Sequence, residues 1–298
     1  MTQKRDTTDQ QWLAERFEQQ RPRLRGVAYR ILGSLSEAED AVQEAWLRVG
    51  RADTDEVENL GAWLTTIVAR VALNGLRART SRREQPLDVH LPDPVIDPAD
   101  GTDPEHEALL ADSVGLALLV VLDALSPAER LAFVLHDTFA VPFDQIAPIV
   151  DRTPEATRQL ASRARRRVRG DVPVPDAPLG EQWRVVDAFL AAARDGDIEG
   201  LVAVLDPDVE LRADGGTCGR SHRARGGETV ARQAAMWSDP ALTVRRALVN
   251  GAPGLVSDRD GVPFSVGAFT IRHGRIVELD FLIDPERLAR LDLRALDR

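Results

Sequence analysis

Cysteine is nearly absent from this chain of 298 residues, whose one thiol belongs to Cys218. A single cysteine excludes an internal disulfide and any zinc site built on cysteines, and it is typical of proteins in a reducing compartment. Long apolar runs are also missing, since the longest candidate, Val114 to Leu122, is too short to span a bilayer. The first residues, Met-Thr-Gln-Lys-Arg-Asp, lack the apolar stretch of an export signal. We therefore expect a cytoplasmic protein with no membrane partner.

Lysine is almost missing as well, so arginine carries the basic charge, and the net charge of −10 hides how that charge is distributed. Residues 63–83 contain five arginines and no acid, and residues 155–169 contain six arginines and one acid. Between them, residues 84–112 hold nine carboxylates and neither Lys nor Arg. Phosphate binding depends on local basic clusters. The pattern indicates two DNA-facing surfaces with a segment between them that avoids DNA, although each basic block could instead be a solvated helix face.

Apolar spacing and proline content divide the chain. Val42, Ala45 and Val49 follow helical spacing, and the set from Ser36 to Glu39 has the form of a capping box. Clustered prolines mark two linkers. The predicted parts are a helical domain (10–84), an acidic proline-rich linker (85–104), a second helical domain (105–170), a short linker (171–180) and a mixed domain (181–298).

The sharpest local pattern lies in the second helical domain. Ser126 to Glu129 forms a capping box with proline at the first helical position, and a short helix follows from Phe143. Asp151-Arg152 then makes a turn, Thr153 caps the next helix, and that helix is rich in arginine. This is the helix-turn-helix pattern, whose second helix enters the major groove. Early Arg and Gln suit base edges and later arginines suit phosphates. The candidate DNA-binding residues are Arg158, Gln159, Ser162, Arg163, Arg165 and Arg166.

Several segments resemble the sigma-70 family of bacterial RNA polymerase sigma factors. Residues 124–130, 144–147 and 161–165 are similar to the fourth conserved region of the family. Residues 39–46 resemble the second-region helix that docks on the polymerase clamp, and residues 62–77 resemble the part that melts and reads the minus-ten element. The resemblance covers residues 10 to 170. The third domain of housekeeping sigma factors is missing, so the chain resembles the extracytoplasmic-function type.

This resemblance implies partners rather than chemistry. It implies binding to core RNA polymerase, at the clamp coiled coil and the flap, and to promoter DNA, with no catalytic residue, cofactor or metal. The helix-turn-helix would read the minus-thirty-five element. The candidate polymerase-binding residues, which share one helix face, are Asp40, Gln43, Glu44 and Leu47. The candidate minus-ten residues are Trp63, Thr66, Arg70, Asn74 and Arg77, of which the arginines suit phosphates and Asn74 suits an extruded base.

The mixed domain begins with an amphipathic helix that ends near Gly196. Alternating strand-like segments follow, the last two of them joined by a His273-Gly274 turn. One helix packed in a curved antiparallel sheet resembles the SnoaL-like cone fold. We therefore predict a multidomain fold, with two all-α sigma domains followed by an α+β SnoaL-like cone.

Three short motifs resemble those of sigma factors that carry this extension. They are Leu91 to Pro94 in the linker, Asp214-Gly215-Gly216, and a stretch that opens with Asp284-Pro285. The resemblance implies a regulator within the chain that replaces a separate anti-sigma factor, and a small-molecule ligand of the cone stays open.

Two further hypotheses also stay open. The first is a ligand-sensing helix-turn-helix repressor that never contacts polymerase. The second is a cone-fold enzyme fused to DNA-binding helices, for which the available acid–base groups are Asp214, His222, His273 and Asp280.

Overall fold

The computed structural model describes residues 2–50, 57, 59–82, 89–101, 115–171, 176–216, 221–236 and 239–297. Cys218 and parts of both predicted linkers lie outside the described residues. The chain divides into two compact units, one of residues 1–84, 107–112 and 121–170, and one of residues 85–106, 113–120 and 171–298. Among the described residues, no helix is both long and apolar enough to cross a membrane.

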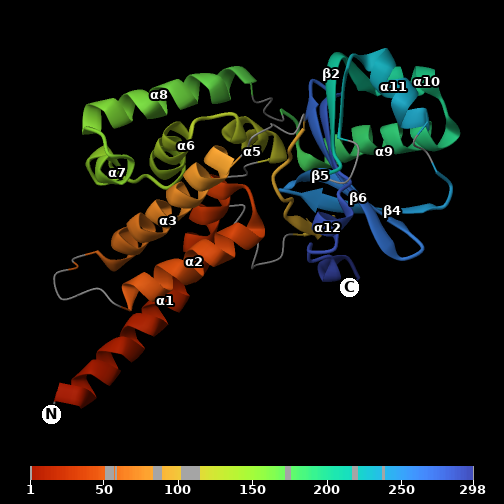
Figure 1. The fold of residues 1–298 in the computed structure, drawn as a ribbon. Coiled ribbons are helices and arrows are strands. Elements are labelled where there is room, and N and C mark those ends of the chain that lie inside the picture. The colour runs from red at the N-terminus through yellow and green to blue at the C-terminus, as the bar shows by residue number, and fades with distance from the viewer. Residues whose placement is uncertain are drawn as a thin grey trace. The chain divides into compact units, whose positions relative to one another are not determined.

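The N-terminal part is a bundle of three helices (Figure 1). They are α1 (Thr2–Leu32), α2 (Leu35–Val49) and α3 (Leu60–Arg82). Apolar side chains at helical spacing on α2, among them Val42 and Ala45, are fully buried against the other two helices. The predicted capping box at Ser36 is wrong. Gly33 turns the chain with a φ of 75°, so Ser34 is the N-cap residue and accepts the Glu37 amide at 3.4 Å.

The second helical part carries the predicted helix-turn-helix. Its elements are α5 (Leu116–Asp123), α6 (Pro127–Phe133), a π-helix (Val134–Thr138), α7 (Phe143–Val150) and α8 (Pro154–Asp171). The capping box of Ser126 and Glu129 is confirmed. Asp151 ends α7 in the left-handed conformation, with a φ of 57°, and the Thr153 hydroxyl accepts the Ala156 amide at 3.2 Å to open α8. Helix α7 continues through Pro148.

The C-terminal part is built on one mixed sheet. Its strands in the described residues are β1 (Ile96–Pro98), β2 (Leu205–Asp214), β3 (His222–Arg225), β4 (Leu242–Val249), β5 (Ala252–Arg259), β6 (Val262–Arg272) and β7 (Arg275–Leu282). They lie in the order β1-β4-β5-β6-β7-β2-β3. Strands β2 and β7 are parallel, and the other neighbours are antiparallel. The predicted turn between β6 and β7 is confirmed, because His273 and Gly274 have φ values of 52° and 70°.

Helices cover one face of this sheet and create its core. They are α9 (Leu179–Asp195), α10 (Ile198–Val204) and α11 (Gly227–Met236), while α12 (Pro285–Leu288) and a 3-10 helix (Arg294–Asp297) follow the last strand. Phe189 of α9 packs edge-on against Phe269 of β6, with ring centroids 5.4 Å apart, and Leu211 and Leu279 join the same buried cluster. Two helical domains followed by an α+β domain confirm the predicted fold class.

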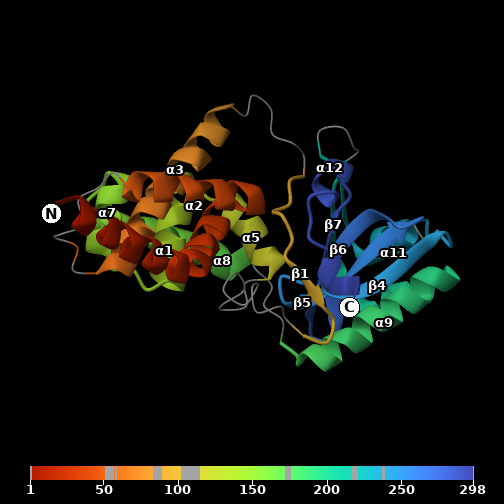
Figure 2. The same cartoon turned by 90° about the horizontal axis from the view of Figure 1, so that it is seen from below.

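Part of the acidic linker belongs to this sheet, whereas the sequence predicts no strand in it. Ile96 pairs with Val249 and Pro98 with Ala247, so β1 forms an edge strand beside β4 (Figure 2). Val89, Leu91 and Val95 are buried as well. The prolines of the linker are compatible with this role because proline is tolerated in an edge strand. Apolar side chains between those prolines supply the burial that holds the segment in place.

Candidate DNA, polymerase and linker sites

The predicted polymerase-binding face lies on α2 and is exposed. Asp40, Gln43, Glu44 and Leu47 all point away from the bundle core, and Leu47 is 62% exposed. Asp40 and Glu44 also line a groove of about 410 Å³ between the helices, together with Glu37 and Arg79, which pair at 3.2 Å. An exposed leucine beside an acidic groove suits a basic helical partner that offers an apolar contact.

The predicted minus-ten residues lie along α3. Arg70, Asn74 and Arg77 are exposed, whereas Trp63 and Thr66 are half-buried. The Thr66 hydroxyl donates to the Ala62 carbonyl at 3.0 Å, so this side chain is partly engaged within its own helix. The three exposed side chains remain accessible to a nucleic-acid strand.

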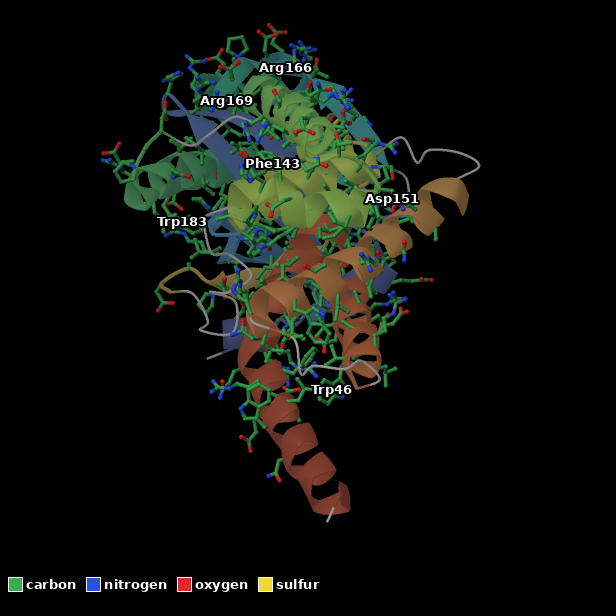
Figure 3. All side chains as sticks on the ribbon, turned by 90° about the vertical axis from the view of Figure 1, so that its left-hand side faces the viewer. Trp46, Phe143, Asp151, Arg166, Arg169 and Trp183 are labelled. Carbon is green, nitrogen blue, oxygen red and sulfur yellow. The ribbon has the colours of Figure 1, made fainter. Side chains whose placement is uncertain are left out.

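The arginines of α8 differ in their contacts. Arg163 donates from Nε to Glu129 Oε1 at 3.0 Å, and Arg165 donates from Nε to Asp137 at 2.6 Å. Gln159, Ser162 and Arg166 are exposed; Figure 3 shows Arg166 and Arg169 on α8 and Phe143 on α7. The helix therefore presents an exposed basic face whose arginines are partly oriented by carboxylates.

Glu129 links the start of α6 to this helix. Although burial raises the pKa of its carboxyl, hydrogen bonds from Ser126 and Arg163 lower it below its ordinary value. Glu129 is therefore ionised at neutral pH and orients Arg163.

The helix-turn-helix packs on the three-helix bundle within the same compact unit. Arg130 of α6 is 1% exposed, donates from Nε to the Arg30 carbonyl of α1 at 3.0 Å, and donates from Nη1 to Asp123 at 2.8 Å. Burial lowers the pKa of Arg130 to about 10, so the guanidinium stays charged at neutral pH. Arg77 of α3 also lies 3.9 Å from the Asp151 carboxylate at the helix-turn-helix turn. A predicted minus-ten residue thus faces the module predicted to read the other element.

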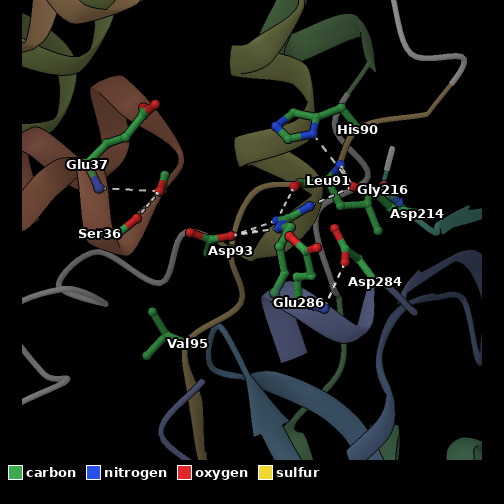
Figure 4. Close-up of polar contacts among 12 residues, drawn as sticks. Ser36, Glu37, His90, Leu91, Asp93, Val95, Asp214, Gly216, Asp284 and Glu286 are labelled. Atoms are coloured by element: carbon green, nitrogen blue, oxygen red, sulfur yellow. Dashed lines mark hydrogen bonds and ion pairs between the residues drawn. The ribbon is translucent and has the colours of Figure 1, made fainter. Parts of the chain in front are cut away.

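The three motifs of the C-terminal part meet at one buried site (Figure 4). Asp214, at the end of β2, has no exposed surface, and its Oδ2 accepts the Leu91 amide at 2.8 Å and Arg287 Nη1 at 2.7 Å. Arg287 also donates to the Leu91 carbonyl at 2.6 Å and to Asp93 Oδ1 at 2.7 Å. One arginine of the cone therefore binds both the backbone and a carboxylate of the linker.

Glycine and asparagine complete this site. Gly216 has a φ of 67°, and a Cβ there would lie 2.1 Å from the Asp284 carboxylate, so the close approach of the two motifs requires glycine. Asp284 caps α12 by accepting the Glu286 amide at 3.0 Å, which places Arg287. Further along the linker, the Val95 amide donates to Asn250 Oδ1 at 3.2 Å, and the Asn250 amide donates to the Val95 carbonyl at 2.8 Å. Gly215 and Pro285 lie beside these contacts in sequence.

A second charged cluster lies on β2 and β7. Arg212 donates to both carboxylate oxygens of Asp280, at 2.6 and 3.2 Å, and Glu278 lies 3.0 Å from the same guanidinium. Burial, aided by the negative charges of Asp280 and Glu210, raises the pKa of Glu278 to about 7 despite Arg212. The pKa of Arg212 is raised because its carboxylate neighbours outweigh the opposing effect of burial.

The four acid–base groups considered for catalysis do not converge. Asp280 is engaged by Arg212, and Asp214 is engaged by Arg287 and the linker. His222 Nε2 is 3.0 Å from Gln233 Oε1, and His273 contacts Asp176 through its backbone amide and its ring. Each of the four groups therefore contacts a different partner.

The sequence prediction did not single out the residues that hold the linker on the cone. Arg287 lay inside a motif segment but was given no role, and Asn250 was missed. A signal was present, because Asn250-Gly251 and Asp260-Gly261 flank β5 and both pairs have positive φ. Asn-Gly and Asp-Gly are the strongest short-range hairpin signals. They would have located β5 and the turn that meets the linker.

Together, a helical bundle with an exposed acidic face, a helix-turn-helix with a basic second helix, and a fused α+β domain define a DNA-binding transcription protein. The family model for Sigma-70 region 2 matches residues 16–82, and the model for Sigma-70, region 4 matches residues 115–168.

Relatives match over nearly the whole chain. The chain is 38% identical to the ECF RNA polymerase sigma factor SigJ of Mycobacterium tuberculosis, covering 93% of this chain and 94% of the relative. It is 34% identical to the probable ECF RNA polymerase sigma factor SigI of the same species, covering 88% and 90%. The crystal structure of M. tuberculosis SigJ superposes with a TM-score of 0.74 at 34% identity, covering 94% of this chain and 99% of that one. The chain belongs to the extracytoplasmic-function group of the sigma-70 family, whose members direct RNA polymerase to promoters.

Proposed function

We propose that this chain binds core RNA polymerase through the exposed face of α2 and reads promoters with α3 and α8. The observation that supports this most is the exposed Leu47, on the same helix as Asp40 and Glu44, which line a groove of the bundle that also bears α3. Asp40, Gln43 and Glu44 surround that leucine with groups that complement a basic clamp surface. The flap of the polymerase is the proposed second contact, on the helix-turn-helix domain. Such a subunit works beside the chromosome, in the bacterial cytoplasm.

In this proposal, each promoter element is read by a different helix. On α3, Arg70 and Arg77 hold phosphates of the minus-ten element, while Asn74 reads a base that leaves the stack. Trp63 and Thr66 support this surface from half-buried positions. On α8, the residues that reach the minus-thirty-five element are Arg158, Gln159, Ser162, Arg163, Arg165 and Arg166, with bases contacted early in the helix and phosphates later.

The C-terminal domain regulates this activity by holding the linker between the two DNA-binding domains. Asp214 and Arg287 together make four contacts with Leu91 and Asp93, at 2.6 to 3.0 Å. Charge-assisted hydrogen bonds of this kind are about twice as strong as neutral ones. A linker held along the cone is not free to bind along the surface of polymerase. The domain thereby takes the place of a separate anti-sigma factor, and we propose that it acts by binding and not by catalysis.

The distance between the two promoter elements bears on whether this domain activates or inhibits transcription. Their names place them about 25 base pairs apart, roughly 85 Å along B-DNA at about 3.4 Å per base pair. In the described unit, Arg77 of α3 lies 3.9 Å from Asp151 at the turn before α8. Both elements are therefore engaged only after the helix-turn-helix leaves the bundle. We propose that holding the linker opposes that opening and that the C-terminal domain therefore inhibits.

Polymerase binding is tested with two exposed apolar residues of similar size. Leu47→Asp adds a charge to the proposed interface, whereas Ile198→Asp adds the same charge to the cone, where Ile198 is 44% exposed. We expect Leu47→Asp to weaken binding of the full chain to purified core polymerase by at least about tenfold, as an interface anchor does. Ile198→Asp should bind like the wild type in the same titration. Equal affinity for all three proteins contradicts the α2 assignment.

A further inference from the structure

The Phe143 side chain occupies the junction between the two helices of the helix-turn-helix. It is the first residue of α7 and is half-buried. The His136 ring stacks on it with a centroid distance of 3.8 Å and an interplanar angle of 26°. His136 is itself held close to the chain segment before α7, since its Nδ1 lies 3.0 Å from the Val141 carbonyl oxygen. The aromatic ring of Phe143 is thus stacked on a side chain of the π-helix that precedes α7.

Arg158, in the early part of α8, lies over this ring with Cζ 5.4 Å from the centroid. Its side chain is exposed, and no described carboxylate lies within ion-pair distance of it. Arg163 and Arg165, by contrast, each donate from Nε to a carboxylate. On α8, an aromatic ring therefore orients Arg158, whereas carboxylates orient Arg163 and Arg165.

The difference matters for reading a base. A carboxylate that orients a guanidinium uses its N–H donors, whereas an aromatic face attracts the cation through its π electrons and leaves the donors unused. Specific recognition of guanine needs two parallel N–H donors aimed at O6 and N7. Arginine also loses much rotamer freedom when it is fixed, so prior orientation reduces the entropic cost of binding. Arg158 combines an oriented side chain with donors that no carboxylate of the described residues occupies.

We infer that Phe143 is a positioning residue for Arg158 and that it determines specificity at one base pair of the minus-thirty-five element, with guanine as the favoured base. The inference rests on the proposed role of α8. Phe143 does not touch DNA in this account. It acts by holding the guanidinium of Arg158 in the orientation that a guanine edge requires.

The test measures how strongly holoenzyme, assembled from full-length chain and core polymerase, binds promoters with each minus-thirty-five base pair substituted in turn. The proteins are wild type, Arg158→Ala, Phe143→Leu, Phe143→Tyr and the double variant Phe143→Leu/Arg158→Ala. Leucine keeps an apolar side chain at the start of α7 but removes the π face, and tyrosine retains it.

We expect Arg158→Ala to lose discrimination at one base pair. Phe143→Leu should lose two- to fivefold of discrimination at that same base pair and none elsewhere, the range expected for a cation–π contact at an exposed site. Phe143→Tyr should retain it, and the double variant should match Arg158→Ala because the two residues act as a unit.

Different failures have different meanings. If Arg158→Ala loses discrimination while Phe143→Leu keeps it, the positioning role is wrong and the proposed role of α8 stands. Equal losses by Phe143→Leu at every base pair indicate a merely structural residue and overturn the inference. Additive losses in the double variant also overturn it. If Arg158→Ala alters no base preference, the proposed DNA-reading role of Arg158 fails, and this inference fails with it.

Discussion

Asp214 shows how much one side chain depends on its neighbours. A carboxylate with no exposed surface is stable only when donors replace its lost water. One donor is the Leu91 amide of the linker, and another is Arg287, which also binds the linker. A further donor is the Gly216 amide at 3.0 Å. Releasing the linker removes the Leu91 amide and the His90 ring, whose Nδ1 lies 3.6 Å from Asp214 Oδ2, and leaves two donors on the cone. The site can therefore exchange its linker contact without leaving Asp214 unpaired.

The raised pKa of Glu278 leads to a prediction about how the stability of the protein depends on pH. Its pKa rises from 4.5 to about 7 on folding, so the folded domain binds this proton more tightly than the unfolded chain does. The favourable contribution is fully present below about pH 4.5 and is lost as pH rises through about 7. At about 1.4 kcal/mol per pKa unit the loss is at most about 3.5 kcal/mol, and less where Arg212 adjusts.

The variant Glu278→Gln carries no titrating group at this position. The free energy of unfolding of this variant and of the wild type is measured with urea on the full chain between pH 4.5 and 8. Hydrogen-exchange protection of β7 reports unfolding of this domain. We expect the wild-type free energy of unfolding to fall relative to the variant across this range. Parallel pH profiles for the two proteins contradict the raised pKa.

At the scale of elements, β1 is a short strand that depends on its partners. Isolated strands of three residues have little stability of their own, so the pairing with β4 and the contact between Val95 and Asn250 must hold it. Asn250 has a φ of 50°, a conformation that glycine and aspartate also tolerate. Asn250→Gly removes the side-chain acceptor, whereas Asn250→Asp retains an oxygen at that position.

We expect hydrogen exchange of the Val95 to Asp97 amides to rise about fivefold in Asn250→Gly, in line with the loss of about 1 kcal/mol for one hydrogen bond. In Asn250→Asp the exchange should stay near the wild-type rate. Mass spectrometry of the peptide that contains β1 measures both. Unchanged exchange in the glycine variant means that the Asn250 side chain does not hold the linker.

Local signals explain which elements were predictable. The turn before α8 was found because Asp151, Thr153 and Pro154 each act within a few residues of their own position. Strand β1 was not found because it has three residues, one of them Pro98, and its partner Val249 lies far along the chain. Among the site residues, the exposed face of α2 followed from helical spacing. The Asp214–Arg287 contact did not, since no local pattern brings those residues together.

The capping error at Ser36 has a similar cause. Two serines precede acidic residues there, and sequence spacing alone does not choose between Ser34 and Ser36. The positive φ of Gly33 decides, because it fixes where the chain leaves α1. Such backbone conformations are set by packing between helices.

On the scale of the whole molecule, two sets of contacts resist opening. Within one compact unit, Arg130 and Arg77 join the helix-turn-helix to the bundle. Within the other, Asp214, Arg287 and β1 hold the linker on the cone. In the proposed function, the first set must yield before both promoter elements are bound, because those elements are far apart on DNA. We propose that regulation is a shift between closed and open populations, set by how tightly the linker is held.

The most direct test is run-off transcription with purified core polymerase and the full chain, comparing wild type, Asp93→Arg and Asp100→Arg. Asp93→Arg places a cation against Arg287 without altering the cone, and Asp100→Arg makes the same charge change at an exposed linker position. We predict initiation at one defined site by all three proteins. Asp93→Arg should yield on the order of tenfold more transcript, since both hydrogen bonds from Arg287 to Asp93 are lost, and Asp100→Arg should match wild type. No defined start from any protein, or no gain from Asp93→Arg over Asp100→Arg, contradicts a sigma factor controlled by its held linker.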